Sequence, residues 1–324
     1  MEYKNILITG GCGFIGSNFV NYIVPLYPET NFYNIDALYY SGNVNHVKIS
    51  NYSNYKFING NIKDIPLIES IFKNYNIDAV IHFAAQSHVD TSFVDSFIYT
   101  EDNIYGTQVL LHIATLYKQQ FKKFIHISTD EVYGESSDIS KTEESVLNPT
   151  NPYAASKAAA EMMVNAYKYS HNLPVVITRG NNVYGPNQHT EKLIPKFINL
   201  LENNKKCTLH GQGKSIRSFL HVGDVVRAIE IILLRGVIGE IYNIGTDKEY
   251  SIIEIATKLI NKIHNTNDTS LHVEYIPDRL YNDKRYFISY KKLSDLGWEP
   301  IIELDDGLTS LLKEYSRGYT TNNI

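Results

Sequence analysis

Tyr153 and Lys157 are a pair of side chains whose types and spacing suit catalysis. They lie four residues apart after Pro152, so a helix that begins there places both on one face. An ammonium group close to a phenol lowers the pKa of the phenol, and the phenolate can then take a proton from a substrate hydroxyl. Tyr and Lys also occur at this spacing by chance, as a solvated surface pair. The surrounding fold therefore has to distinguish a catalytic pair from a surface pair.

Asp130 and Glu131 form a second candidate pair. They follow Thr129 at the end of the apolar run 123–128. Adjacent carboxylates repel each other unless their environments differ, and such a pair can divide into a protonated acid and an ionised base. The alternative is that they cap a helix or solvate a loop, and position alone leaves both interpretations open.

A glycine-rich segment near the start predicts a dinucleotide site. Gly10, Gly13 and Gly16 follow an apolar run and open a helical pattern, and the segment also fits GxGxxG from Gly11. Glycines allow a tight turn and let a pyrophosphate approach the backbone at a helix N-terminus. Asp36 comes 20 residues after Gly16, where a carboxylate binds the ribose hydroxyls of NAD and repels the extra phosphate of NADP. The alternative is a glycine turn that serves packing alone.

The candidate residues can act together only if strands and helices bring them to the same edge of a sheet. The first half of the chain has a residue pattern that predicts such a sheet. Apolar strands that alternate with helices indicate a parallel sheet covered on both faces, a doubly wound α/β fold. Ligands of such sheets bind at the carboxyl ends of the strands, where Thr129, Asp130 and Glu131 would lie. The expected strands are 3–9, 32–36, 55–59, 79–83, 123–128 and 174–179, and the expected helices are 14–24, 66–75, 97–118 and 152–169.

The second half predicts a smaller α/β lobe. We expect residues 1–180 to form the dinucleotide-binding domain and residues 181–324 the substrate lobe. Residues 219–245 should return to the large sheet as a strand at 219–221, a helix at 222–234 and a strand at 240–244. The lobe should contain a helix at 193–202, strands at 207–210 and 271–276, and two or three helices after residue 251.

Composition excludes several classes of protein. The 324 residues carry 30 Lys+Arg against 35 Asp+Glu, and this net charge of −5 comes without the basic stripe of a nucleic-acid binder. Cys12 and Cys207 are too few for a disulfide framework, and without HxH or HxxxH pairs no metal site is expected. No run approaches the roughly 18 apolar residues of a membrane span, and no secretory signal precedes the first strand. We therefore expect a cytoplasmic protein that binds neither nucleic acid nor membrane.

The combination of motifs resembles the extended short-chain dehydrogenase/reductase superfamily, and within it the nucleoside-diphosphate-glucose 4,6-dehydratases. The resemblance covers nearly the whole chain and implies a Rossmann sheet with a C-terminal substrate lobe. Asp130-Glu131 is its specific element, because sugar epimerases of the superfamily typically carry small hydroxyl residues there. The segments that carry it are ILITGGCGFIGS, HFAAQSHVD, NIYGT, HISTDEVYGE, NPYAASKAAAE, RGNNVYGPNQ, EKLIPKFI, YNIGT and NDKRYF.

The resemblance implies a redox-neutral reaction with NAD as a permanently bound cofactor, the first step from dTDP-glucose or UDP-glucose toward rhamnose-type deoxysugars. Tyr153, assisted by Lys157, would remove the C4 hydroxyl proton while Thr129 hydrogen-bonds the C4 oxygen. Glu131 would take the C5 proton, and Asp130 would protonate the departing C6 hydroxyl. Two alternatives remain: a UDP-hexose 4-epimerase, which needs neither carboxylate, and a non-enzymatic NAD-sensing regulator, which is expected to lack one of the two pairs.

The resemblance also implies two sets of binding residues. The cofactor set is Gly10, Gly13, Phe14, Ile15, Gly16, Asp36, Asn61, Ile62, Ala84, Ala85, Tyr153 and Lys157. The substrate set is Ser87, His88, Asn182, Lys192, Arg217, Arg279 and Tyr286. Two positions depart from the family: Asn61 replaces a frequent Asp that contacts adenine, and Thr91 replaces a frequent Arg.

A homodimer is the expected assembly. Helices 97–118 and 152–169 are apolar around much of their circumference, and a helix that is apolar all round is buried. As in relatives, two helices from each subunit would pair into a four-helix bundle. The alternative is that these helices are buried against the chain's own lobe. The apolar residues in question are Leu110, Leu111, Ala158, Met162 and Met163.

Overall fold

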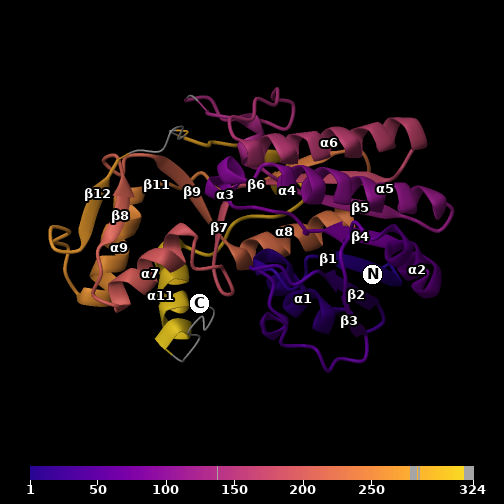
Figure 1. Ribbon diagram of the computed structural model, residues 1–324, viewed down its shortest axis with the longest axis horizontal. Coiled ribbons are helices and arrows are strands. Elements are labelled where there is room, and N and C mark those ends of the chain that lie inside the picture. The colour runs from indigo at the N-terminus through magenta and orange to yellow at the C-terminus, as the bar shows by residue number, and fades with distance from the viewer. Residues whose placement is uncertain (137, 278–282, 284, 317–324) are drawn as a thin grey trace.

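The computed structural model describes residues 1–136, 138–277, 283 and 285–316, and its largest element is a sheet of seven parallel strands in the order β10-β6-β5-β4-β1-β2-β3 (Figure 1). This is the predicted doubly wound fold. The strands are β1 (Asn5–Thr9), β2 (Asn31–Asp36), β3 (Tyr55–Asn59), β4 (Ala79–His82), β5 (Lys123–Thr129), β6 (Val175–Gly180) and β10 (Ile241–Ile244).

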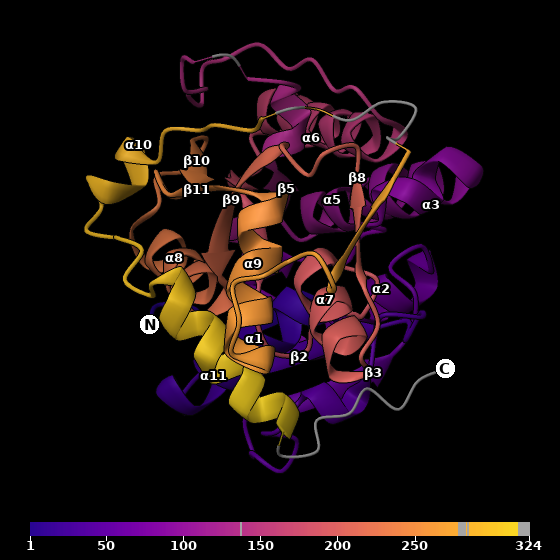
Figure 2. The same cartoon turned by 90° about the vertical axis from the view of Figure 1, so that its left-hand side faces the viewer.

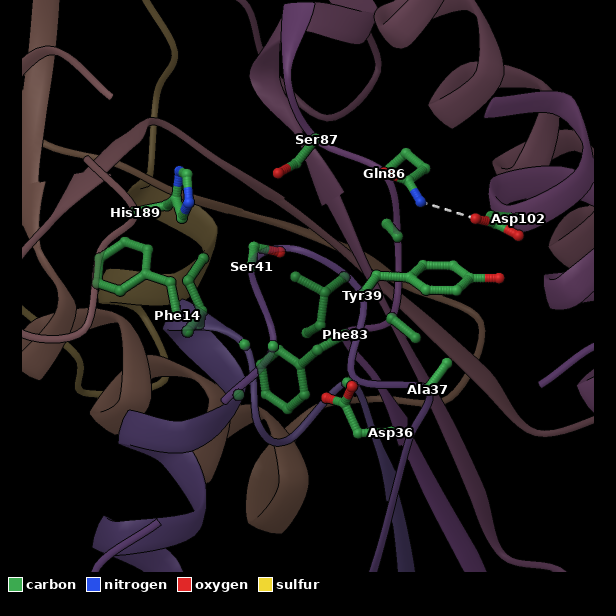
Figure 3. Close-up of a pocket in the computed structure, with 18 of the residues that line it drawn as sticks. Phe14, Asp36, Ala37, Tyr39, Ser41, Phe83, Gln86, Ser87, Asp102 and His189 are labelled. Carbon is green, nitrogen blue, oxygen red and sulfur yellow. Dashed lines mark hydrogen bonds between the residues drawn. The ribbon is translucent and has the colours of Figure 1, made fainter. Parts of the chain in front are cut away.

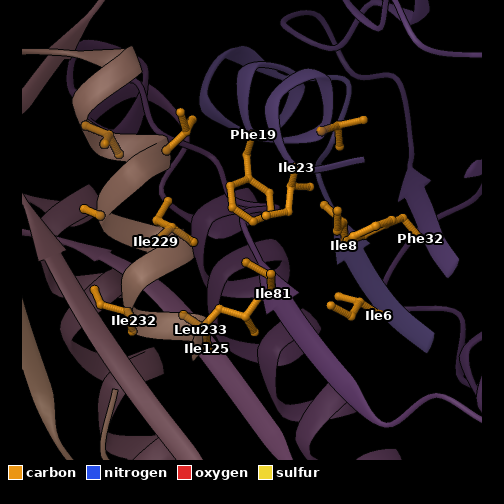
Figure 4. Close-up of a cluster of buried hydrophobic side chains, with 14 of the residues drawn as sticks. Ile6, Ile8, Phe19, Ile23, Phe32, Ile81, Ile125, Ile229, Ile232 and Leu233 are labelled. Carbon is orange, nitrogen blue, oxygen red and sulfur yellow. The ribbon is translucent and has the colours of Figure 1, made fainter. Parts of the chain in front are cut away.

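Helices cover both faces of this sheet. On one face α1 and α8 pack against β1, β4 and β5, and Figure 4 shows Phe19 and Ile229 from the two helices close to Ile81 of the sheet. On the other face α2, α5 and α6 bury a second apolar cluster that includes Phe72, Leu110 and Val164. The bounds are α1 (Phe14–Leu26), α2 (Ile65–Tyr75), α5 (Gly106–Leu116), α6 (Pro152–His171) and α8 (Val222–Arg235).

The predicted helix at 97–118 is not continuous. It consists of α4 (Phe97–Tyr99), a π-helical turn η2 (Thr100–Tyr105) and then α5. The remaining short helices of this half are the 3₁₀ turns η1 (Val44–His46) and η3 (Asp130–Tyr133), and the helix α3 (Val89–Val94).

A second lobe has its own apolar core, in which α7, α9 and α11 lie together (Figure 2). Its helices are α7 (Leu193–Glu202), α9 (Ile252–His264) and α11 (Leu304–Ser316). Two small sheets complete it, with the orders β11-β9-β7 and β12-β8. Their strands are β7 (Asn182–Tyr184), β8 (Cys207–His210), β9 (Ile216–His221), β11 (Glu249–Ser251) and β12 (Val273–Ile276).

The expected return to the large sheet is correct for α8 and β10 but wrong for 219–221. Those residues belong to β9, which pairs with β7 and β11. A second return was not predicted: α10 (Lys291–Ser294) supplies Leu293, and Trp298 follows it, both fully buried in the core between α1 and α8. Among the described residues no helix is long and apolar enough to cross a membrane.

Candidate active site

A large pocket lies at the carboxyl ends of β1, β2, β4 and β5 (Figure 3). The space between its walls, which includes open solvent, is about 1320 Å³. All of the predicted cofactor residues line it, and so do Ser87 and Lys192 of the predicted substrate set. The residues predicted to bind the cofactor therefore share one pocket.

The N-terminus of α1 is open toward this pocket. No side chain caps the helix at Gly13, and no acidic residue lies in its first turn. The first N–H groups of a helix lack intrahelical partners and carry the positive end of its dipole. Gly10 has a φ of 71°, and a Cβ at this residue would lie 2.6 Å from the backbone nitrogen of Ala84. A Cβ at Gly16 would overlap the carbonyl oxygen of Gly10. This bare N-terminus fits a pyrophosphate.

Asp36 and Asn61 lie farther along the same pocket. The Asp36 carboxylate accepts hydrogen bonds from the backbone nitrogens of Leu38 and Cys12, at 2.8 and 2.9 Å. A carboxylate offers about four acceptor positions, so two remain for ribose hydroxyls. The amide of Asn61 donates to the hydroxyl of Tyr39 at 2.7 Å. Both residues therefore fit the nucleoside end of a dinucleotide.

Asp130 and Glu131 begin η3 directly after β5. Burial and the neighbouring Glu131 raise the pKa of Asp130 to about 7, against opposing effects that include a hydrogen bond from Asn181. Burial also raises the pKa of Glu131, while a hydrogen bond from Asn151 and the charges of Arg217 and Lys192 oppose the rise. The two carboxyls thus have different surroundings, as an acid and a base require.

Tyr153 and Lys157 lie on α6, and Tyr153 is close to the carboxylate pair of η3. Burial, followed by the charge of Glu131, raises the pKa of Tyr153 well above its ordinary value. Lys157 donates to the carbonyl oxygen of Ile127 at 2.7 Å, and burial lowers the pKa of its ammonium to about 8. Lys157 alone therefore does not depress the phenol's pKa as the spacing suggested, because burial and the carboxylates outweigh it.

Three of the predicted substrate residues, Arg217, Lys192 and Tyr286, lie close enough to Glu131 for an electrostatic interaction. The guanidinium of Arg217 lies 4.7 Å from the ring centre of Tyr286, and it donates to the carbonyl of Asp283 at 2.7 Å. Lys192 donates to the carbonyl of Ser87 at 2.8 Å. Asn182 opens β7, while Arg279 lies outside the described residues.

His88 and Thr91 form a contact at the pocket's rim. The Nδ1 atom of His88 lies 2.7 Å from the Thr91 hydroxyl and 3.4 Å from the Glu191 carboxylate. Thr91 stands where the family often has Arg, and here it orients a predicted substrate residue.

Three residues at the site were missed by the sequence analysis. Asn181 donates to Asp130 at 2.7 Å, and Asn151 donates to Glu131 at 3.1 Å while its carbonyl oxygen caps α6 through Ala154. Glu191 contacts His88 and lines the pocket. An Asn directly before Pro is a helix N-cap signal, which could have identified Asn151.

No group of three or more His, Cys, Asp and Glu side chains in the described part of the chain could hold a metal ion.

Known proteins are similar to this chain over almost its full length. Residues 7–311 match the family described as GDP-mannose 4,6 dehydratase. The dTDP-D-glucose 4,6-dehydratase of Mus musculus is 46% identical over 98% of this chain and 90% of its own. A trifunctional UDP-glucose 4,6-dehydratase of Arabidopsis thaliana is 45% identical over 97% of this chain and 47% of its own.

Solved structures agree with this similarity. The dTDP-glucose 4,6-dehydratase of Streptomyces venezuelae, solved with NAD bound, has a TM-score of 0.92 and 37% identity, covering 97% of each chain. The UDP-glucose 4-epimerase of Thermotoga maritima has a TM-score of 0.88 and 29% identity, covering 97% of this chain and 99% of its own. The fold is thus common to dehydratases and epimerases, and the identity is higher to the dehydratase.

Proposed function

The chain belongs to the GDP-mannose 4,6 dehydratase family, and from this premise we infer that it is an NAD-dependent hydro-lyase acting on dTDP-glucose or UDP-glucose. The product is the 4-keto-6-deoxyglucose nucleotide and water. The observation that carries this function is the buried pair Asp130 and Glu131 beside Tyr153. An epimerase needs no acid for C6 and no base for C5.

The cofactor is NAD, which fits the bare N-terminus of α1 and the carboxylate of Asp36. When bound, NAD supplies a hydride acceptor for C4, a hydride donor for C6 and a positive charge on its oxidised ring. Residues 1–180, whose sheet is completed by β10, provide most of its pocket, and the second lobe within residues 181–324 provides most of the nucleotide-sugar site. The ammonium of Lys157 keeps two of its three donors available for ribose hydroxyls.

Tyr153 takes the proton from the C4 hydroxyl, with Thr129 next to it as hydrogen-bond partner. Burial raises the pKa of the phenol, and the positive charge of the oxidised cofactor ring would act with Lys157 against that rise when NAD is bound. The resulting C4 ketone acidifies the C5 hydrogen. The active site therefore excludes water from the base and compensates for that exclusion with charge.

Glu131 then removes the C5 proton and Asp130 protonates the C6 hydroxyl, which leaves as water. Asp130 suits the role of acid because its pKa is raised to about 7, so a substantial fraction holds a proton near neutral pH. Glu131 suits the role of base because Arg217 and Lys192 favour its ionised form. Arg217, Tyr286 and Lys192 also provide cationic and aromatic contacts for the nucleoside diphosphate.

Variants of these residues separate oxidation from elimination. Glu131→Gln and Asp130→Asn should still oxidise C4 and reduce bound NAD, but dehydration should slow by about 10²–10⁴-fold. Tyr153→Phe should abolish NAD reduction itself, because the first proton has no acceptor. The measurements are absorbance in the NADH band and 4-keto-6-deoxy product. Normal dehydration by Glu131→Gln would contradict the assignment and favour an epimerase.

The two substrate bases differ by one methyl group, worth about 1–3 kcal/mol in a pocket. We therefore expect kcat/KM for dTDP-glucose and UDP-glucose to differ by roughly 10–200-fold. Steady-state assays of both sugars on one preparation measure the ratio. Failure to dehydrate either sugar would contradict the proposed substrate class.

We also propose a homodimer through the outer surfaces of α5 and α6. Three of the five residues that suggested it are buried within the chain itself: Leu110 and Leu111 in the apolar cluster on the sheet, and Ala158 in a cluster with Tyr133 of η3. Exposed apolar side chains remain on α5, α6 and the turns before α5. They are Phe97, Tyr105, Leu116, Met162 and Tyr169. Light scattering at micromolar concentration should give twice the 37.0 kDa of one chain.

A cytoplasmic location is part of the proposal. Cys12 and Cys207 are both buried free thiols, as is usual in a reducing compartment. Cell fractionation should recover the protein with soluble cytoplasmic markers, and recovery with secreted proteins would contradict it.

A further inference from the structure

A buried ion pair lies behind the proposed catalytic residues. Arg179, near the end of β6, donates from Nε and Nη2 to both carboxylate oxygens of Glu161 on α6, the shortest bond being 2.6 Å. Their exposed fractions are only 3% and 0%. Because both charges must leave water, such a pair adds little to stability compared with an apolar pair of the same size. We therefore look for a role of this ion pair in holding neighbouring residues in place.

A tyrosine extends this ion pair to a third element. Arg179 Nη1 donates to the hydroxyl of Tyr133 at 2.8 Å, and its guanidinium lies 4.7 Å from the centre of that ring. The Tyr133 hydroxyl in turn donates to Asn243 Oδ1 at 2.8 Å. Asn243 donates from its amide to the carbonyls of Lys141 and Ser289. Each of these polar groups has a partner, so the buried network is complete.

Every charged or aromatic member of the network is close in sequence to a proposed catalytic group. Tyr133 comes two residues after Glu131, within the same turn η3. Glu161 follows Lys157 by one turn of α6, and its charge opposes the lowering of the Lys157 pKa. Arg179 precedes Asn181 by two residues, and Asn181 donates to Asp130. The network thus joins η3 and α6, which carry the two catalytic pairs, to β6.

We propose that Glu161, Arg179 and Tyr133 are positioning residues that hold the Asp130–Glu131 pair at a fixed place relative to Tyr153 and Lys157. This inference rests on the proposed function. Oxidation at C4 needs Tyr153, Lys157 and Thr129 in place but neither carboxylate. Elimination also needs the carboxylates to reach C5 and C6 of the same sugar. A misplacement of about 1 Å can cost on the order of 10²-fold in rate. Loosening the network should therefore slow elimination more than oxidation.

Tyr133→Phe is the main test, because it keeps the ring over Arg179 and removes only the hydroxyl that bridges Arg179 and Asn243. Tyr3→Phe is a matched control: Tyr3 is also buried, and its hydroxyl donates to the Leu233 carbonyl at 3.3 Å, at the amino end of β1. Purified holoenzymes are mixed with the sugar nucleotide that the parent uses. Bound-NAD reduction and product formation are followed in the same single turnover, and KM and kcat in the steady state.

In Tyr133→Phe we expect NAD reduction within about threefold of the parent rate, KM within about threefold, and elimination at least about tenfold slower. Reduced cofactor should then accumulate, while Tyr3→Phe keeps both rates. If NAD reduction and elimination slow equally, or if neither slows, the inference is overturned. A parent enzyme that forms no 4-keto-6-deoxy product would instead refute the proposed function.

Glu161→Gln gives a second readout. Without the Glu161 carboxylate the pKa of Lys157 should fall further, so the alkaline limb of the oxidation step should move to lower pH. A limb that stays at the parent's pH would contradict the part assigned to Glu161. If this variant fails to fold because Arg179 is left unpaired, the ratio of the oxidation and elimination rates in Tyr133→Phe still tests the inference.

Discussion

Asp130 keeps its proton to a higher pH than an ordinary aspartate because protein encloses it and Glu131 follows it directly. The same enclosure raises the pKa of Glu131, but Arg217 and Lys192 act against that rise. Neighbouring side chains therefore give two chemically similar carboxyls different tasks. This arrangement costs folding free energy, since a buried carboxylate is less stable than a hydrated one.

Asp130→Asn should stabilise the protein at alkaline pH while it removes activity. The folded-state pKa of Asp130, about 7, lies above the ordinary 3.8, so its ionisation costs stability as pH rises from about 4 to 7, and the full cost applies above that range. Asn avoids this cost and can still accept the bond from Asn181. We expect the free energy of unfolding to rise by about 4 kcal/mol near pH 8 and to be unchanged near pH 4.

Urea unfolding of the parent and the variant at both pH values measures this difference. Glu69→Gln, at an exposed position of α2, is the control and should show no such pH dependence. A variant that is no more stable than the parent at the higher pH would contradict the raised pKa.

Gly16→Ala should weaken NAD binding, since its Cβ would overlap the carbonyl oxygen of Gly10 in the loop that faces the pyrophosphate. Backbone must shift to relieve this overlap, at a cost of about 1–3 kcal/mol. Gly180→Ala is the control, because its Cβ would meet only the Ile244 carbonyl oxygen, at 4.0 Å. NAD released from the denatured, purified variants can be counted by absorbance. Full NAD content in Gly16→Ala would refute the prediction.

The sequence points to candidate catalytic side chains more directly than to their surroundings. Glycine spacing and the Tyr–Lys pair are local patterns, so they are visible in the chain itself. The contact of Asn181 with Asp130 depends on how β6 pairs beside β5, and the family resemblance implied only its neighbour Asn182, as a substrate residue. The raised pKa of Tyr153 likewise depends on burial by distant segments.

A helix or strand could be predicted from the sequence where the same hydrophobic pattern runs along its whole length. β3, α7 and β8 have the predicted bounds, because their patterns and flanking polar residues agree. The π turn η2 was not predictable, since it changes the backbone spacing without a distinctive residue. Its effect is to direct Asn103 toward two other segments. Asn103 exchanges hydrogen bonds with the backbone of Gln86 at 2.7 and 3.0 Å and donates to the Ser156 hydroxyl at 2.8 Å.

Asn103→Ala should destabilise the fold by about 1–3 kcal/mol, because it leaves the buried backbone groups of Gln86 without partners. Activity should fall too, since Ser156 lies on α6 between Tyr153 and Lys157. Urea unfolding and steady-state kinetics measure the two effects. Asn165→Ala, at a half-buried position of α6, serves as the control. Equal stability of the two variants would contradict the role given to the π turn.

The segment before α7 closes over the pocket beside the segment that follows β2. Glu191 accepts a hydrogen bond from Tyr40 at 3.0 Å and lies 3.4 Å from His88, so it joins three parts of the pocket rim. Glu191→Ala should release NAD faster than the parent, by about fivefold for each 1 kcal/mol of lost contact. Loss of NAD during timed gel filtration measures the rate. Glu303→Ala, which removes a surface ion pair with Lys248, should retain NAD as the parent does.

Across the whole molecule, segments far apart in the chain share one core. Trp298 is fully buried between the helices of the large sheet, and its indole donates to the carbonyl of Asp224 at 3.0 Å. The sequence after residue 251 contains no pattern that distinguishes packing on the large sheet from packing on the second lobe. Only the three-dimensional structure shows that this segment returns to the core of the large sheet, where it contacts α8 and β10.

The exposed apolar surface of α5 and α6 leads to the last prediction, on assembly. Met162 is 52% exposed and Tyr169 75% exposed on α6, and Leu116 is 59% exposed on α5, the helix that runs alongside α6 (Figure 1). Met162→Lys would place a charge in the centre of the proposed interface, where it loses water without a partner. We expect light scattering to give 37.0 kDa for this variant and twice that mass for the parent. Leu234→Lys, at a 40% exposed position on α8, should leave the parent's mass unchanged. A parent that already has the mass of one chain would refute the dimer, and a Met162→Lys variant that keeps the doubled mass would move the interface elsewhere.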